Sequence, residues 1–218
     1  MKFREKAIMT LLKHIVLITV LTVTVWPAVS LDIQDVNTAA GTLNIYMTNQ
    51  AGCSYCTDIA YNLTQNDCES WGDDGSGDAS WIHDTSMVEE DCYAAEVSGL
   101  WFDGGVAGFQ FDLSGITITG PTPADASGGS SESAGFFVNS TPTTVLGFSL
   151  SGDPIPEGDG VLVTVTFVPF DGDICFTGLD NLNEGGDPNP ACLISDVSGV
   201  NVNSDWGGCY CDGIAEDL

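Results

Sequence analysis

The distribution of charge constrains this chain more than any other feature of its sequence. All four Lys and Arg residues lie within the first thirteen positions, and none follows Lys13. Of the 31 acidic residues, only Glu5 precedes Leu31. Because carboxylates beyond Lys13 have no permanent cation to pair with, the fold must depend on apolar burial, hydrogen bonds and covalent links.

The same charge pattern excludes several functions. Contacts to phosphates are normally made by Lys and Arg, so nucleic acids and anionic surfaces are improbable partners. A Lys Schiff base or an arginine clamp is impossible beyond Lys13. Nucleophilic catalysis assisted by histidine would have to use His83, the only histidine after His14. We expect His83 to be an exposed or locally hydrogen-bonded loop residue, and we predict that the protein is not an enzyme.

The N-terminus has the pattern of a secretory signal peptide. A basic stretch over residues 1–14 precedes the apolar run Ile15–Trp26, and the small residues Ala28 and Ser30 suit a cleavage site. We predict a signal peptide over residues 1–30, cut after Ser30, and a secreted or cell-surface protein that leaves the membrane after cleavage. An uncleaved N-terminal anchor is the alternative.

Eight cysteines agree with export. An even number of cysteines in an exported chain predicts a disulfide framework. Zinc is the alternative, because Cys53, Cys56, Cys68, Cys92 and His83 include enough ligand types for a site. The predicted disulfide residues are Cys53, Cys56, Cys68, Cys92, Cys175, Cys192, Cys209 and Cys211.

The chain contains two regions of different amino-acid composition. Residues 104–204 are rich in Gly, Thr, Val and Phe and alternate with a period of two, as in Phe109-Gln110-Phe111-Asp112-Leu113. The run 160–168 is β-branched and apolar on both faces, which predicts a central strand. Residues 51–103 instead concentrate Cys, Trp and acidic residues. We therefore predict an all-β sandwich or jelly roll over residues 31–50 and 104–218, with residues 51–103 as a disulfide-stapled insertion.

Several of these segments resemble the successive strands of cohesin-like domains: residues 41–47, 106–113, 145–149 and 155–162, with a closing stretch over 192–199. The resemblance implies a jelly-roll sandwich that binds another protein or a surface and performs no chemistry. In cellulosomal cohesins the partner is a calcium-loaded dockerin. The insertion at 51–103 departs from the family pattern, which has a short turn between the first two strands.

The resemblance also implies a disulfide pairing. In cohesin-like sandwiches the first and last strands are parallel neighbours, so Cys53 and Cys56 would pair with Cys209 and Cys211 in one of two ways. Cys68 would then pair with Cys92. The remaining bridge would join Cys175 and Cys192.

Calcium is the cofactor that the acidic residues favour. Asp74, Ser76 and Asp78 have the alternating ligand spacing that begins an EF-hand loop, although the rest of that motif is missing. Residues 180–187 form a second loop rich in Asp and Asn. An ordinary flexible acidic loop is the alternative at both places.

The aromatic residues are candidates for binding. Trp71, Trp81, Trp101 and Trp206 lie in or beside the cysteine-rich parts, where they could stack on sugars or anchor a neighbouring subunit. Alternatively, several of them form the small core of the insertion. Two sequons predict glycosylation at Asn62 and Asn139 if the source glycosylates asparagine.

Two functions remain. The first is a secreted structural or adhesive module that contacts itself or another extracellular protein, and that self-assembles. The second is a carbohydrate-binding module assisted by calcium, with a polysaccharide as its partner.

Overall fold

The structure is a computed structural model that describes residues 27–118, 125–178 and 191–211. The described residues form a nine-stranded sheet and a three-stranded sheet, so the prediction of an all-β fold is confirmed. The jelly-roll connectivity stays a prediction. The strands are β1 (Val29–Asn37), β2 (Thr42–Asn49), β3 (Gly52–Cys56), β4 (Trp81–Asp84), β5 (Leu100–Phe102), β6 (Gly108–Ile118), β7 (Ala126–Ser127), β8 (Phe136–Ser140), β9 (Thr144–Ser149), β10 (Gly158–Thr177), β11 (Leu193–Ser195) and β12 (Ser204–Trp206).

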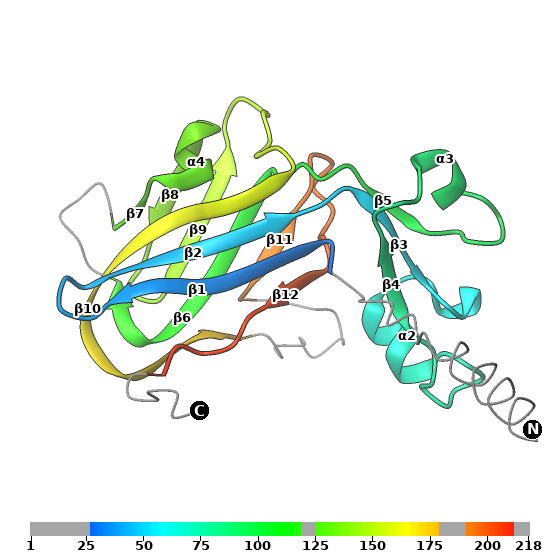
Figure 1. Ribbon diagram of the computed structural model, residues 1–218, viewed down its shortest axis with the longest axis horizontal. Coiled ribbons are helices and arrows are strands. Elements are labelled where there is room, and N and C mark those ends of the chain that lie inside the picture. The colour runs from blue at the N-terminus through cyan, green and yellow to red at the C-terminus, as the bar shows by residue number, and fades with distance from the viewer. Residues whose placement is uncertain (1–26, 119–124, 179–190, 212–218) are drawn as a thin grey trace, which may run out of the picture.

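The nine-stranded sheet folds over into two layers that share one long strand (Figure 1). Its order is β12-β1-β2-β10-β6-β9-β8, with β11 paired to β6 and β7 paired to β10. The first half of β10 pairs with β2 over residues 158–166, and the second half pairs with β6 over residues 167–177. Thus β10 is central, as its β-branched, apolar sequence predicted.

The core lies between these two layers. Every second side chain of β2 is buried, including Leu43, Ile45 and Met47, and the same alternation in β6 buries Phe109, Phe111 and Leu113. Side chains of a strand alternate between the two faces of its sheet, so both strands present one apolar face to a single cluster. Because the buried faces are apolar and the outer faces polar, the alternation of apolar and polar residues in the sequence fixes the register in which these strands pair with their neighbours.

The N-terminal strand was not predicted. β1 pairs antiparallel with β2 and parallel with β12, with Val29 opposite Asn49 and Ser204. Val29 is fully buried, and the Ala28 carbonyl accepts a hydrogen bond from the amide of Gln50. The folded sheet therefore begins before Leu31, and a cut after Ser30 would remove part of β1. Most of the predicted signal peptide, residues 1–26, lies outside the described residues.

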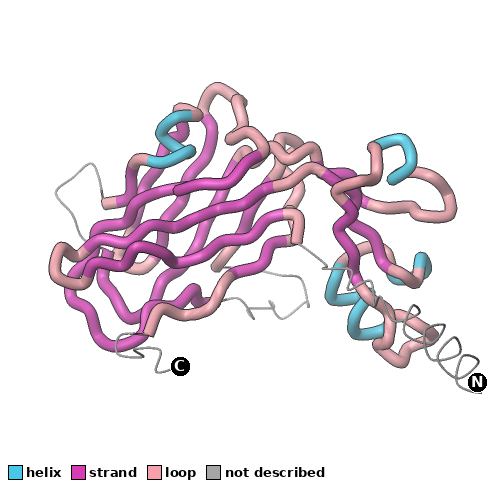
Figure 2. The backbone as a smooth tube through the Cα atoms, in the orientation of Figure 1, coloured by secondary structure: helices cyan, strands magenta, loops and turns pink. Residues whose placement is uncertain are grey.

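The three-stranded sheet, ordered β4-β3-β5, forms a smaller body within residues 51–103. Short helices surround it, as Figure 2 shows. A compact cluster of Cys56, Cys68, Ala79 and Trp81, with Tyr61 against it, is its core. The helices of the described chain are η1 (Ile59–Tyr61), α2 (Gln65–Trp71), α3 (Glu89–Cys92) and, beside the sandwich, α4 (Gly129–Ser133).

Asn49 forms hydrogen bonds at the junction between the smaller body and the sandwich. It is the last residue of β2 and is buried, and its Nδ2 donates to the carbonyls of Gly104 and Pro156. The first of these carbonyls lies where the chain returns from the smaller body. The side-chain amide of Asn49 therefore joins the segment that leaves the sandwich at the end of β2 to the segment that re-enters it at Gly104.

Candidate binding groove

The disulfide pairing differs from the expectation. Cys53 is bonded to Cys92, Cys56 to Cys68, and Cys175 to Cys209. The predicted bridges from the insertion to the C-terminus, together with Cys68–Cys92 and Cys175–Cys192, are therefore wrong. Six of the eight cysteines are in disulfides, while Cys192 is a buried free thiol and Cys211 an exposed one.

The strand arrangement explains this error. The first and last strands are parallel neighbours, but the first strand is β1 and the strand that leads into Cys53 is β2. β2 lies beside β1 and β10, not beside β12. The insertion therefore closes its own two bridges, and the C-terminal Cys209 reaches the second half of β10 at Cys175.

His83 is a structural residue of the smaller body. It lies in β4, is 6% exposed, and its ring nitrogens contact Ser54 Oγ at 2.9 Å and the Gln50 carbonyl at 3.1 Å. Burial lowers the pKa of His83, against weaker opposing effects from the Gln50 carbonyl and the Asp84 carboxylate. His83 is therefore hydrogen-bonded, but its partners are 29 and 33 positions away in sequence, and the expectation of an exposed or locally bonded loop residue is wrong.

The two sequons differ in their surroundings. Asn62 is buried: its Oδ1 accepts from the amide of Cys56, and its Nδ2 donates to the carbonyls of Val97 and Ser98. Because both amide hydrogens have partners inside the fold, the prediction of a glycan on Asn62 is wrong for the folded protein. Asn139 lies exposed on β8, and its glycosylation stays a prediction.

The predicted calcium loop is open and exposed. Asp74 has a positive φ of 58°, and Ser76 Oγ accepts from the amide of Asp78 at 3.3 Å, which occupies that oxygen within the turn. Among the described residues, no group of three or more His, Cys, Asp or Glu side chains could hold a metal ion. Residues 180–187 of the second candidate loop lie outside the described part of the chain.

The four tryptophans lie in different environments. Trp206 packs edge-on against Phe176 in the main core, with ring centroids 5.2 Å apart. Trp71 is 59% exposed at the end of α2, and Trp101 is half-buried in β5. Trp81 is 4% exposed in the core of the smaller body. The alternative reading, a small aromatic core in the insertion, is therefore confirmed for Trp81.

Trp81 also borders the space between the smaller body and the sandwich. Three adjoining cavities of about 340, 700 and 280 Å³ lie there, and Trp81 and Asn203 line all three. We call this space the groove. The wall on the smaller body is α2 and β4, and the wall on the sandwich is the segment 201–206 that leads into and forms β12.

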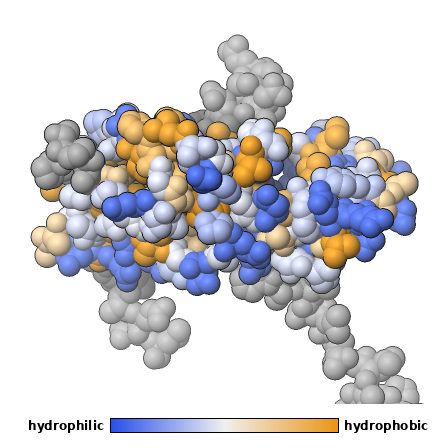
Figure 3. Space-filling view, turned by 90° about the horizontal axis from the view of Figure 1, so that it is seen from above, coloured by the Kyte–Doolittle hydropathy of each residue, from blue (hydrophilic) through white to orange (hydrophobic). Residues whose placement is uncertain are grey.

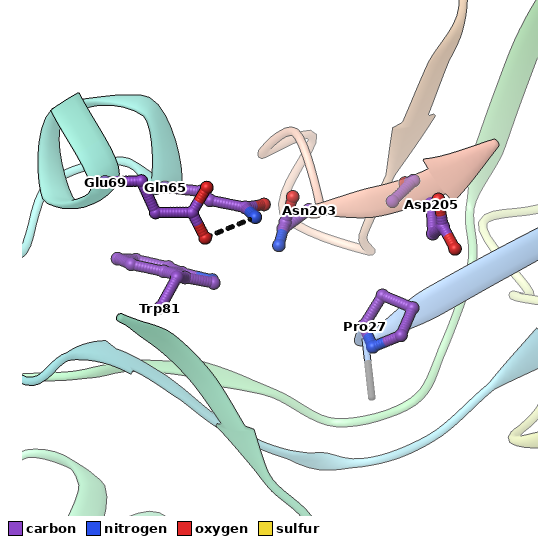
Figure 4. A pocket seen from close by; sticks show the side chains of 7 residues that line it. Pro27, Gln65, Glu69, Trp81, Asn203 and Asp205 are labelled. Atoms are coloured by element: carbon purple, nitrogen blue, oxygen red, sulfur yellow. Dashed lines mark hydrogen bonds between the residues drawn. The ribbon is translucent and has the colours of Figure 1, made fainter. Parts of the chain in front are cut away.

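The local sequence places polar side chains on both walls (Figure 4). Gln65 and Glu69 are one helical turn apart, so they share a face of α2, and Gln65 Nε2 donates to Glu69 Oε1 at 2.9 Å. Thr64 caps this helix by accepting from the amide of Asp67. Opposite them lie Asn203 and Asp205. These polar residues carry no motif, so sequence reasoning did not identify them.

The indole nitrogen of Trp81 is the least satisfied group at the groove. Trp81 Nε1 is a buried donor without a hydrogen-bond partner among the described residues. In Figure 4 the nitrogen-bearing edge of the indole faces the hollow between α2 and β12. A buried donor without a partner costs about 1–3 kcal/mol, so a group that accepts its hydrogen there would gain affinity.

The fold and groove define an all-β protein whose two-layered sheet carries a small disulfide-bridged body. No protein family, curated protein or solved structure matches the chain. Disulfides persist in oxidising surroundings, so its three bridges indicate such an environment. In the described part of the chain, no helix has the length and apolar character needed to cross a membrane.

Proposed function

We propose that this is a secreted, non-enzymatic structural or adhesive protein that binds a second copy of itself or another extracellular protein. The observation that carries the proposal is an exposed aromatic pair on the sandwich. Phe137 on β8 and Phe148 on β9 are opposite each other in register, are 47% and 37% exposed, and have ring centroids 5.4 Å apart. Exposed apolar clusters of this kind mark interaction surfaces.

The surrounding residues extend this surface. Leu146, two residues before Phe148 on the same face of β9, is 39% exposed, and Leu150 beyond the strand is 73% exposed. We call Phe137, Leu146 and Phe148 the outer apolar face. Figure 3 shows apolar side chains at the surface of both parts of the molecule in the view from above. Aromatic side chains that become buried dominate the energetics of protein interfaces.

The position of His83 supports a role without catalysis, because its ring is held by Ser54 and Gln50 inside the smaller body. Secretion is supported by the three disulfides and by the N-terminal sequence pattern.

Light scattering of the purified protein at rising NaCl tests self-association. We expect the wild type to associate towards 1 M NaCl, where repulsion between carboxylates is screened, and Phe137→Ser/Phe148→Ser to remain monomeric. Val168→Ser, which removes an exposed apolar side chain of β10, is the matched control and should associate like the wild type. Crosslinking to extracellular proteins of the source tests for binding to a different protein. If the double variant is crosslinked to these proteins as efficiently as the wild type, the role of the outer apolar face is refuted.

A further inference from the structure

We propose that the groove between α2 and β12 binds a neutral oligosaccharide, with the Trp81 indole N–H donating a hydrogen bond to one of its hydroxyl oxygens. This site is separate from the outer apolar face, because none of the residues of that face lines the groove. Loss of one activity would therefore leave the other intact.

The groove needs a ligand that can both accept and donate hydrogen bonds. Trp81 Nε1 can only donate, and it has no partner among the described residues. The Glu69 and Asp205 carboxylates, which also line the groove, can only accept when ionised. A sugar hydroxyl satisfies both requirements, because its oxygen accepts while its hydrogen is donated.

Charge selects among ligands that have hydroxyl groups. Glu69 and Asp205 both line the cavities of about 340 and 700 Å³, and no Lys or Arg exists beyond Lys13 to offset them. An anionic ligand would be repelled by this lining. A cationic ligand would be attracted, but an ammonium group cannot accept the Trp81 hydrogen. A neutral, polyhydroxylated ligand meets both conditions.

The other walls suit a chain of sugar rings. Leu63 and Leu100 border the widest cavity and are 79% and 48% exposed, so they offer apolar surface to the C–H faces of a ring. Asn201 and Asn203 add amide groups, which both donate and accept. The widest cavity, of about 700 Å³, lies within the size range of sites for small organic ligands.

Isothermal titration calorimetry with neutral hexasaccharides of glucose, xylose, mannose and N-acetylglucosamine tests the proposal on the purified full chain at 0.15 M NaCl. We expect at least one of them to bind, and hexagalacturonate, which has a carboxylate on each ring, not to bind. Trp81→Phe keeps an aromatic ring but is smaller than the indole and lacks its N–H, so it should weaken binding about fivefold to tenfold. Trp71→Phe is the matched control, because Trp71 lies outside the cavities, and should bind like the wild type.

Asn203→Ala provides a second variant on the opposite wall, outside the core of the smaller body. It should weaken binding by a similar factor even if Trp81→Phe disturbs folding, which circular dichroism and the melting temperature monitor. The proposal is overturned if no neutral hexasaccharide binds, or if both groove variants bind as tightly as the wild type. Binding of a neutral hexapeptide of Asn, Gly and Ser in place of every sugar would assign the groove to polypeptide and also overturn it.

Discussion

Ser54 Oγ lies 2.9 Å from His83 Nδ1, across the β3–β4 ladder in which the two residues are directly paired. The other ring nitrogen, Nε2, lies 3.1 Å from the Gln50 carbonyl oxygen. A carbonyl can only accept, so Nε2 carries a hydrogen. The Ser54 hydroxyl can either donate to Nδ1 or accept from it, and burial, which lowers the pKa of His83, favours the neutral imidazole in which Nδ1 accepts.

This arrangement predicts that His83 makes the protein less stable as the pH falls. Burial lowers the pKa of His83 in the folded state, so the unfolded chain takes up its proton first, near pH 6.5. Stability is complete above that pH and declines below it, by no more than about 1.4 kcal/mol per pH unit for one proton. Urea unfolding at pH 7.5 and 5.5 should show a greater loss for the wild type than for His83→Gln.

Asp84 does not interfere with that comparison. Hydrogen bonds from Ser86 lower the pKa of Asp84, so its contribution to stability is lost only when the pH falls below about 4. All other carboxylates are common to both proteins. If wild type and His83→Gln lose the same free energy of unfolding between the two pH values, the assigned neutral state of His83 is wrong.

The free thiols should differ in reactivity. Cys211 is exposed, and its pKa is raised chiefly by a hydrogen bond with Asp173, whereas burial raises the pKa of Cys192. At pH 8 the native protein should release one equivalent of thionitrobenzoate from Ellman's reagent quickly and a second only on unfolding. Cys211→Ser should abolish the fast phase and Cys192→Ser should retain it. A native protein with no titratable thiol would contradict the structure.

The uncompensated charge predicts a response to salt. Because no Lys or Arg occurs in the described part of the chain, raising NaCl from 0.02 to 0.3 M should screen repulsion between carboxylates and raise the melting temperature. Differential scanning calorimetry measures the change, and the same NaCl series at pH 3, where most carboxylates are protonated, should show a smaller rise. A melting temperature that is independent of salt at pH 7 would refute this account.

Gly147 on β9 should not tolerate a side chain. A Cβ at this position would lie 2.2 Å from the Phe109 ring, and Phe109 is fully packed in the core. Gly147→Ala is therefore expected to destabilise the fold by about 1–3 kcal/mol through overpacking. Gly158→Ala, where a Cβ meets nothing within 4 Å, is the control in chemical denaturation. Equal stabilities of the two variants would disprove close packing at Gly147.

The strands that could be predicted are those in which apolar and polar residues alternate clearly within the strand itself. Phe109, Phe111 and Leu113 alternate with polar residues, and the structure buries these three side chains in β6. β1 was missed because its first residues continue the apolar N-terminal run, so no change of composition marks its start. Its partner β12 is only three residues long, which is too short for a periodic pattern.

The candidate groove could be predicted only in part. Trp81 was singled out because aromatic residues are concentrated in the insertion. Glu69 and Asn203, however, are 134 positions apart in sequence and meet only because the smaller body lies against the β12 edge of the sandwich. The disulfide partners also could not be predicted from the residues alone, since the number and spacing of cysteines do not determine which of them pair.

The strand shared by the two layers has a consequence for folding. Residues 158–166 of β10 complete one layer and residues 167–177 complete the other, so one continuous strand couples the two layers. The sandwich should consequently open in a single concerted event, in which amide hydrogens from both halves of β10 exchange with solvent at the same rate. A protease would then find no partly opened form of the sandwich to cleave.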